Sequence, residues 1–324
     1  MEKTRKWRWG VKRWIVLGLI ILSVVGVKII KPVQPHIQVA PEAIMKEPLF
    51  NLPVIGDFYL TNTIVAMLLM DVVIVIIALL VRNGARKNGL VPKGIAGAFD
   101  MIVDMLYKMT ESTAGKYAKK IFPWFATILI LVLFANLIKL LPGFETVGIL
   151  EEREHGYAIQ ELDGNWATLV NDPTHEGSGY ILTPFVRALS TDLNFTAALA
   201  LIAVLMTQVI GIQAQGFRYF SKFLNFTTMF KKPFLGFMDF IVGILELISE
   251  LSKILSFAFR LFGNMFAGMV LMALVGVMVP VFAPSMIMMF ELFIGAIQAY
   301  VFGMLTLTFM AQATQGHSGG EEHA

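Results

Sequence analysis

The chain has 324 residues, of which 56% are hydrophobic and only 15% are charged, and its formal net charge is +3. A water-soluble domain carries about a quarter charged residues, so this composition indicates a polytopic membrane protein. Cysteine is absent, which excludes disulfides, thiolate metal sites and cysteine nucleophiles. All five histidines lie outside the apolar segments, and no basic and aromatic run suggests a nucleic-acid partner. We therefore expect no metal, no cofactor and no nucleic acid.

The first apolar segment, from Trp14 to about Ile30, follows a strongly basic head. Its apolar core is short for a membrane span, so it fits either a cleaved signal peptide or a retained anchor. We favour the anchor because no clear Ala-x-Ala cleavage site follows. The mixed, proline-containing segment 31–59 predicts an extracytoplasmic connector.

The second span is expected from Asn62 to about Val81, with Asp71 near its middle. A carboxyl at that depth either binds a proton or ion, or stays protonated and bonds to a neighbouring helix. We favour the second interpretation. A basic loop follows, and apolar residues at helical spacing between Ile95 and Ala118 predict an amphipathic helix on the cytoplasmic surface.

The third span is expected from Pro123 to about Leu141, and Lys139 near its outer end should snorkel to the surface. The acidic segment 144–189 has few basic residues, which predicts the outer side of the membrane. A fourth span, from Asp192 to about Ile212, leads to a basic loop and so returns to the cytoplasm.

A long apolar stretch from Pro233 to Val279 carries ionisable residues at unusual depths. At 1.5 Å per residue it would reach about 65 Å against a bilayer core of about 30 Å, so it must be strongly tilted or kinked. Its polar residues share one helical face within an arc of roughly 80°. They are Asp239, Glu246, Glu250, Lys253, Arg260 and Asn264. Each charge in hydrocarbon costs about 2.5 to 3.5 kcal/mol or more, so such a stripe normally pairs or lines an ion path.

The last helix, from Met286 to about Thr314, has a second polar stripe at multiples of seven, formed by Glu291, Gln298 and Gln312. It should face the first stripe across a hairpin. We expect an all-α polytopic membrane protein with about six membrane passages and a long tilted helical hairpin at the carboxyl-terminal end. The predicted divisions are a basic head, anchor and connector (1–60), a membrane ion-channel domain (61–314) and a polar tail (315–324).

Several motifs in this hairpin are specific to one family. They are RLFGNMFAG at 260–268, ELISELSKILSFAF at 246–259 and AIQAYVFGMLTLTFMAQA at 296–313, together with TDLNFTAALAL at 191–201 and NLIKLLPG at the end of the third span. The chain closely resembles subunit a of the membrane sector of F-type ATP synthases, over roughly residues 60 to 314. The resemblance implies a non-catalytic ion-translocating stator subunit, and no phosphate-binding loop is found in the chain.

The resemblance further implies that Arg260 faces the carboxylates of a c-subunit ring and divides two half-channels. A guanidinium suits this role because it stays charged in a poor solvent. The structural alternative is that Arg260 only neutralises Glu246 or Glu250. The implied partners are the c-subunit ring, b-type peripheral-stalk subunits, the soluble F1 sector and the lipid bilayer, most plausibly a bacterial plasma (inner) membrane.

Other implied positions are Asn264 and Gln298, which line the ion route, and Glu291, which carries the titratable group of the outer half-channel. Many family members have an acid or histidine at the position of Met269. Because methionine cannot exchange a proton, Glu291 would serve alone, with Asp192 and Asn194 as expected neighbours.

Glu246 and Lys253 match polar positions of the family, and both a channel role and intrahelical charge balancing remain open for them. The expected ion is a proton, with Na⁺ not excluded. The alternative from another class is a secondary transporter with a buried Arg-Glu site, for which the sequence offers neither internal repeats nor interrupted helices.

Overall fold

The computed structural model describes the chain except for its two ends and some short internal segments. The segments outside the description are 1–11, 31–32, 34–35, 46, 54–55, 89–93, 142–143, 155, 163–165, 172–177, 223–232, 281–282 and 316–324. Most of the predicted basic head, the Pro142-Gly143 end of the third span and most of the polar tail therefore lie outside it. So does the side chain of Asp239.

Helices dominate the described residues. The α-helices are α1 (Lys12–Ile30), α2 (Asn62–Asn88), α3 (Ile95–Ala114), α4 (Ala118–Leu137), α5 (Leu193–Gln215), α7 (Pro233–Met278) and α8 (Ala283–Thr314). The short 3₁₀ turns are η1 (Gly115–Tyr117), η2 (Ile138–Leu140), η3 (Leu189–Thr191) and η4 (Gly216–Lys222). The strands are β1 (Phe50–Leu52), β2 (Gly56–Phe58), β3 (Gly148–Arg153), β4 (Ala158–Glu161), β5 (Ala167–Val170) and β6 (Gly179–Pro184).

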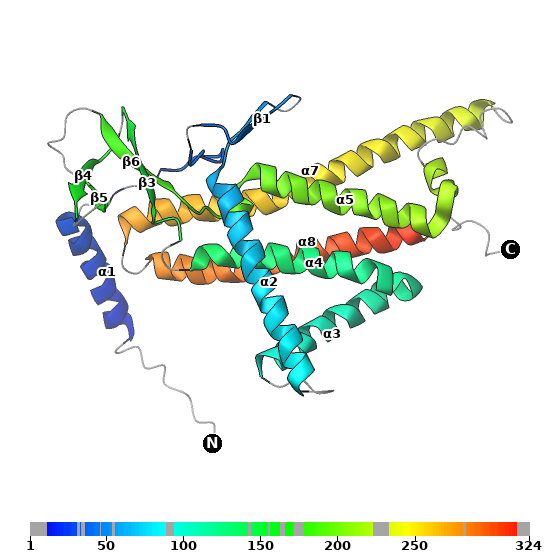
Figure 1. Ribbon diagram of the computed structural model, residues 1–324, viewed down its shortest axis with the longest axis horizontal. Helices are drawn as coiled ribbons and strands as arrows, with labels where there is room; N and C mark the ends of the chain where they lie inside the picture. Colours follow the sequence, from blue (N-terminus) through cyan, green and yellow to red (C-terminus); the bar gives the residue numbers. More distant parts are fainter. Residues whose placement is uncertain are drawn as a thin grey trace, which may run out of the picture.

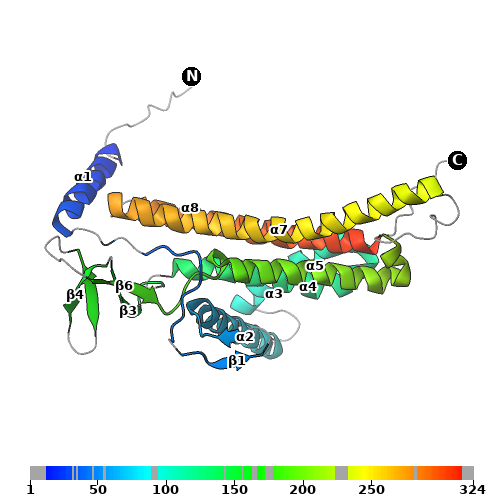
Figure 2. The ribbon, with the colours of Figure 1, turned by 90° about the horizontal axis from the view of Figure 1, so that it is seen from above.

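The long helices α4, α5, α7 and α8 lie lengthwise beside one another, and α2 crosses these four helices steeply (Figure 1). Seen from above, α7 and α8 form one side of this layer, α4 and α5 lie behind them, and α2 is on the far side (Figure 2). The 46 residues of α7 form one continuous helix of about 69 Å. α7 and α8 lie at a steep angle to α2 (Figure 1). The strong tilt in the bilayer that the length of α7 predicts stays a prediction.

The core lies between these four long helices. Apolar side chains of α4, α5, α7 and α8 form one buried cluster that includes Val132, Ala200, Leu261 and Phe302. The rings of Phe257 and Phe302 lie 5.0 Å apart, which joins α7 to α8. This packing fixes the relative position of the two polar stripes.

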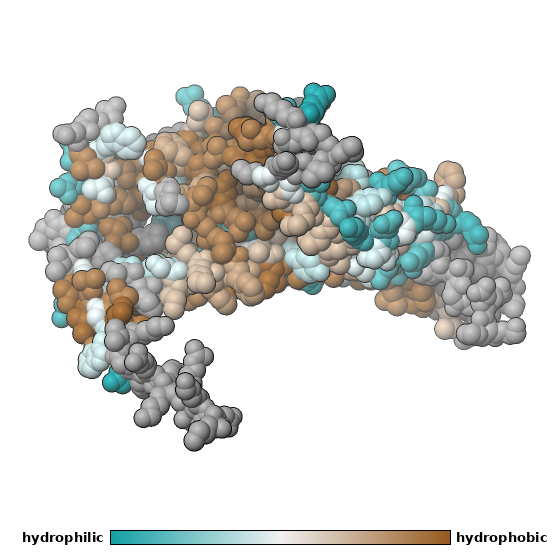
Figure 3. All heavy atoms as spheres, turned by 90° about the horizontal axis from the view of Figure 1, so that it is seen from below, coloured by the Kyte–Doolittle hydropathy of each residue, from teal (hydrophilic) through white to brown (hydrophobic). Residues whose placement is uncertain are grey.

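Five stretches of the described chain are long and apolar enough to cross a membrane: Asn62–Gly84, Ala96–Leu140, Leu193–Phe220, Phe240–Met278 and Ala283–Thr314. The first predicted segment forms a helix, α1, which packs against α7 but is not among the five. A broad apolar band covers the face shown in Figure 3, with hydrophilic residues gathered to one side of it. A bilayer requires both long helices and an apolar surface. Helices satisfy their backbone hydrogen bonds internally, and lipid tails accept only apolar side chains.

Besides the helices there are three small two-stranded antiparallel sheets, which pair β1 with β2, β3 with β6 and β4 with β5. They lie in the connector and in the acidic segment 144–189, for which only composition supported a prediction. In β6 alternate residues are buried, as expected of a strand with one covered face. The β3–β6 and β4–β5 sheets lie near the α7–α8 turn, whereas β1 and β2 lie beside α2 (Figures 1 and 2).

Asp71 is exposed on α2. No hydrogen bond or ion pair joins it to any residue within the described part of the chain. The favoured interpretation, a protonated carboxyl bonded to a neighbouring helix, therefore finds no partner within the described part of this chain and stays a prediction. The predicted amphipathic helix forms as α3 and ends at Ala114, because Gly115 adopts a φ of 52° that other residues rarely take. Its place on the cytoplasmic surface stays a prediction.

Candidate functional site

The polar stripes of α7 and α8 meet at Asn264 and Gln298. The Asn264 side-chain amide Nδ2 donates a hydrogen bond of 2.8 Å to Gln298 Oε1. Gln298 is buried, and its Nε2 has no partner among the described residues. The expectation that the two stripes face one another is confirmed at this pair.

Arg260 lies one turn before Asn264 on the same stripe. Its Nη2 donates to Ser256 Oγ at 3.3 Å, and no carboxylate of the described residues forms an ion pair with it. Ser256 and Asn264, one turn before and one turn after Arg260 on the same face, are both exposed, so this side of α7 is open. Glu250 pairs instead with Lys253 at 2.8 Å. The alternative in which Arg260 only neutralises Glu246 or Glu250 has no support in this geometry.

Glu291 is buried on α8, and its partner comes from the end of α4. Lys139 Nζ lies 3.3 Å from Glu291 Oε2, with the two side chains only 8% and 6% exposed. The prediction that Lys139 snorkels to the surface is wrong. Nothing in the sequence says which helix lies beside η2, so the buried carboxylate that holds this ammonium group could not be found from spacing. Burial of two charges is costly unless they pair, and here they do.

Gly268 lets Glu291 approach α7. A Cβ at residue 268 would overlap Glu291 Oε1, so any other side chain would push the carboxylate away. That Oε1 is buried and has no hydrogen-bond partner among the described residues. One oxygen of Glu291 is therefore held by Lys139, while the other remains free to accept a proton.

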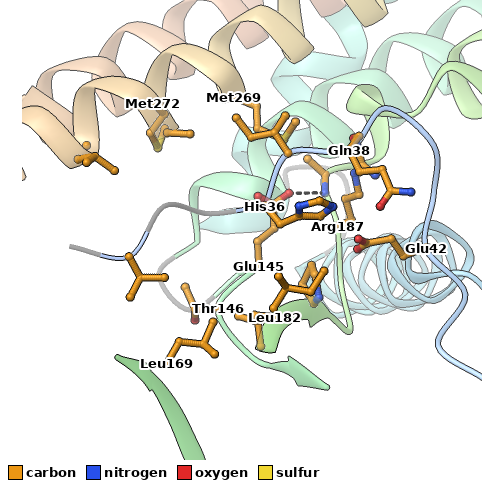
Figure 4. A pocket seen from close by; sticks show the side chains of 18 of the residues that line it. His36, Gln38, Glu42, Glu145, Thr146, Leu169, Leu182, Arg187, Met269 and Met272 are labelled. Carbon is orange, nitrogen blue, oxygen red and sulfur yellow. Dashed lines mark hydrogen bonds between the residues drawn. The ribbon is translucent and has the colours of Figure 1, made fainter. Parts of the chain in front are cut away.

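A cavity of about 580 Å³ lies beside this pair (Figure 4). Glu291 and Lys139 line it together with Met269 and Met272 of α7. Its remaining walls come from the segment 144–150, the β5 and β6 strands, the segment around Arg187 and five connector residues: Val33, His36, Ile37, Gln38 and Glu42. The predicted titratable group of the outer side thus borders a space large enough for water.

Within the described chain no hydrogen bond or ion pair joins Asp192 or Asn194 to Glu291, so their place beside it stays a prediction. Asp192 is the N-cap of α5, where its Oδ1 accepts a hydrogen bond of 2.8 Å from the Asn194 backbone N–H. Neither residue lines the cavity, and no described contact joins either to Glu291. A capping aspartate just before an apolar helix is a local signal, and it accounts for this residue better than an ion route does.

Asn136 is a polar residue of the site that the sequence interpretation missed. Its Nδ2 donates to the Gly295 carbonyl at 3.0 Å, and its Oδ1 accepts from Ser190 Oγ at 2.6 Å. It therefore ties α4 to α8 one turn beyond Glu291. The available signal in the sequence was an amide residue inside an apolar run, within the NLIKLLPG motif. The structure shows that Asn136 is fully buried.

A second Glu–Lys pair lies at the other end of α7. Glu250 Oε1 accepts from Lys253 Nζ, and its Oε2 accepts from Gln208 Nε2 of α5 at 3.0 Å. Tyr219 of η4 donates to Gln208 Oε1 at 2.6 Å. For Lys253 the intrahelical alternative is the one observed, with Glu250 as partner. Glu246 is half-buried on the same helix.

Comparison with known proteins decides the family. The family model described as ATP synthase A chain matches residues 64–311. The chain belongs to this family.

Relatives of the family are similar in sequence over most of their length. The ATP synthase subunit a of Moorella thermoacetica is 27% identical over 72% of this chain and 82% of the relative. The ATP synthase subunit a 1 of Syntrophotalea carbinolica is 28% identical over 74% of this chain and 80% of the relative. The ATP synthase subunit a of Helicobacter pylori (strain Shi470) is 29% identical over 75% of this chain and 88% of the relative.

Membership in the ATP synthase A chain family identifies the protein as an ion-translocating membrane subunit of an ATP synthase, and it is not itself catalytic. The secondary-transporter alternative is not favoured. The matched segment includes Arg260, Asn264, Glu291 and Gln298, whereas the connector residues that line the cavity lie before it.

Proposed function

We propose that this protein is the proton-translocating stator subunit of a rotary ATP synthase, with Arg260 as the barrier between two half-channels. The observation that carries the proposal is the open side of α7. Arg260 has no carboxylate partner among the described residues and lies between Ser256 and Asn264, which are exposed on the same face of that helix. A permanently charged group on a lipid-depth surface needs an anionic partner from outside the chain. A ring of c subunits with a carboxylate on each member meets that need.

In this proposal Glu291 takes and releases protons on the outer side. A relay group needs an accessible acceptor atom, and Glu291 Oε1 is unpartnered beside the cavity. The hydrogen-bonded Asn264 and Gln298 lie between Glu291 and Arg260 in the α7–α8 interface and position the guanidinium. Asp192 and Asn194 act indirectly, by fixing the start of α5, and Glu246 borders the inner route.

The same proposal covers partners, location and domains. The chain would work with a c-subunit ring, b-type peripheral-stalk subunits and the F1 sector, in a bacterial plasma (inner) membrane. The part that does so is the membrane ion-channel domain, 61–314, preceded by the head, anchor and connector at 1–60 and followed by the polar tail at 315–324.

Substitution of Arg260 by alanine tests the proposal. We expect Arg260→Ala to abolish proton-driven ATP synthesis in membrane vesicles while the complex remains assembled, because the guanidinium acts on the ring and not on folding. Arg260→Lys should fail as well, since an ammonium group can lose its proton when desolvated. Arg153→Ala, on the exposed β3 strand, is the matched control and should behave as the wild type. Wild-type synthesis by Arg260→Ala would refute the proposal.

A further inference from the structure

The outer wall of the cavity beside Glu291 is formed by a part of the chain that the family match does not cover. The match begins at residue 64, whereas His36, Gln38 and Glu42 of the connector line the cavity. Figure 4 shows these three residues close to Arg187, with Met269 and Met272 of α7 on the opposite side. The connector is therefore part of the space that leads to the buried carboxylate.

Specific hydrogen bonds hold this part of the connector in place. Arg187 is only 5% exposed, and its guanidinium donates to the carbonyl oxygens of Gln38 and Ala40, the latter at 2.8 Å. Asn62, fully buried at the start of α2, donates from Nδ2 to Glu42 Oε2 and accepts from the Glu42 backbone N–H, both at 3.3 Å. Two buried polar side chains thus hold the connector segment 38–42 in place beside the cavity.

Three titratable side chains that line the cavity differ in how deeply they are buried. His36 is exposed, Glu42 is half-buried, and Glu291 is buried with one unpartnered oxygen. Glu145 also lines the cavity, but its Oε1 already accepts a hydrogen bond of 2.7 Å from the Ala188 backbone N–H. His36 and Glu42 are therefore the groups best placed between the outer water and Glu291.

Resting on the proposed function, we propose that protons reach Glu291 through this cavity and that His36 and Glu42 of the connector are its entry residues. The connector then serves as a working part of the ion path in addition to joining α1 to α2. In each transfer one proton passes through cavity water from a donor to the next acceptor, in the direction of Glu291. The next incoming proton then restores the charge of the donor.

The environment of Glu42 supports this role. Burial raises the pKa of its carboxyl above the ordinary value, and this effect outweighs the opposite influence of Arg187 and His36. Glu151 raises it and Arg153 lowers it to a smaller extent. A carboxyl with a raised pKa exchanges protons more readily near neutral pH than an ordinary one.

The first test removes the exchangeable protons and keeps the hydrogen bonds. Glu42→Gln retains an oxygen for Asn62, and with His36→Gln it should lower proton-driven ATP synthesis in membrane vesicles severalfold. Glu47→Gln is the matched control, because Glu47 is an exposed carboxylate of the same connector that does not line the cavity. An unchanged rate in the double variant would overturn the role of both entry residues.

The second test locates the route itself and uses the absence of cysteine from the chain. Ala273 lines the cavity, whereas its neighbour Leu274 does not and is 58% exposed on α7. A charged, membrane-impermeant thiol reagent added from the outer side should block proton flux in Ala273→Cys and spare Leu274→Cys. Flux that survives in Ala273→Cys after complete labelling would place the entry elsewhere. Arg260→Ala is measured in the same vesicles. If Arg260→Ala loses function while the labelled Ala273→Cys keeps its flux, the entry route is wrong but the proposed function stands.

Discussion

The two buried Glu–Lys pairs of this protein differ in what surrounds them. Near the α7–α8 turn, Lys139 of η2 reaches Glu291 beside a cavity, and Glu291 Oε1 has no hydrogen-bond partner among the residues that the structure describes. At the other end, Glu250 pairs with Lys253 three residues along the same helix, and Gln208 occupies its second oxygen. The same two residue types thus form one open and one saturated arrangement.

This difference separates a group that can exchange protons from one that holds helices together. A carboxylate whose two oxygens are both bonded has little reason to accept another proton, while one with a free oxygen beside water can do so repeatedly. We therefore assign ion transfer to the outer pair and structural support of α5, α7 and η4 to the inner pair.

The largest expected effect on stability comes from Lys139→Met. Removal of the ammonium leaves the Glu291 carboxylate buried and unpaired, which costs about 3 to 5 kcal/mol for such a pair. Thermal unfolding of the complex, followed through this subunit, should show the loss. The double variant Lys139→Met with Glu291→Gln should recover much of it. Equal instability of the single and double variants would mean that the two side chains do not depend on one another.

A smaller effect is expected from Gly268→Ala. The added methyl group would collide with Glu291 Oε1, and overpacking of this kind costs about 1 to 3 kcal/mol. Because the carboxylate must move, proton-driven synthesis should fall together with stability. Gly276→Ala is the control on the same helix, since its Cβ would meet Pro284 only at an ordinary 3.8 Å. Identical behaviour of the two variants would remove the argument for a required close approach.

The smallest effect is expected at the inner pair. Tyr219→Phe deletes one hydrogen bond to Gln208, which contributes about 1 kcal/mol, and leaves Glu250 bonded to Lys253 and Gln208. Stability should drop slightly, and the rate of proton-driven synthesis per assembled complex should not change. A strongly reduced rate would show that the inner network also carries protons.

Sequence reasoning reached the parts of this site that repeat along a helix. Polar residues at helical spacing placed Asn264 and Gln298 on facing stripes, and the hydrogen bond between the two side chains confirms that the stripes face one another. The RLFGNMFAG and AIQAYVFGMLTLTFMAQA motifs identified the family that the comparison then established.

Contacts between distant segments were beyond the sequence. A single lysine near the end of a span usually snorkels, so the burial of Lys139 depends on where α8 lies. Asp192 was expected beside Glu291 because of the family resemblance. In the structure it occupies the N-cap position of α5, where an aspartate commonly caps a helix. The hairpins of the outer segment depend on pairing across β3 and β6, and composition alone does not specify that.

Proton-driven ATP synthesis by Glu291→Gln and Glu250→Gln, measured in parallel and normalised to assembled complex, tests the central distinction most directly. Each change replaces a carboxylate by an amide of the same shape that cannot exchange a proton. We expect Glu291→Gln to lower the rate by roughly a hundredfold, without a proton leak because Arg260 remains, since positioned acid–base groups contribute about that much or more. Glu250→Gln should stay close to the wild-type rate. A strong loss in Glu250→Gln, or a normal rate in Glu291→Gln, would contradict the assignment of ion transfer to the outer pair alone.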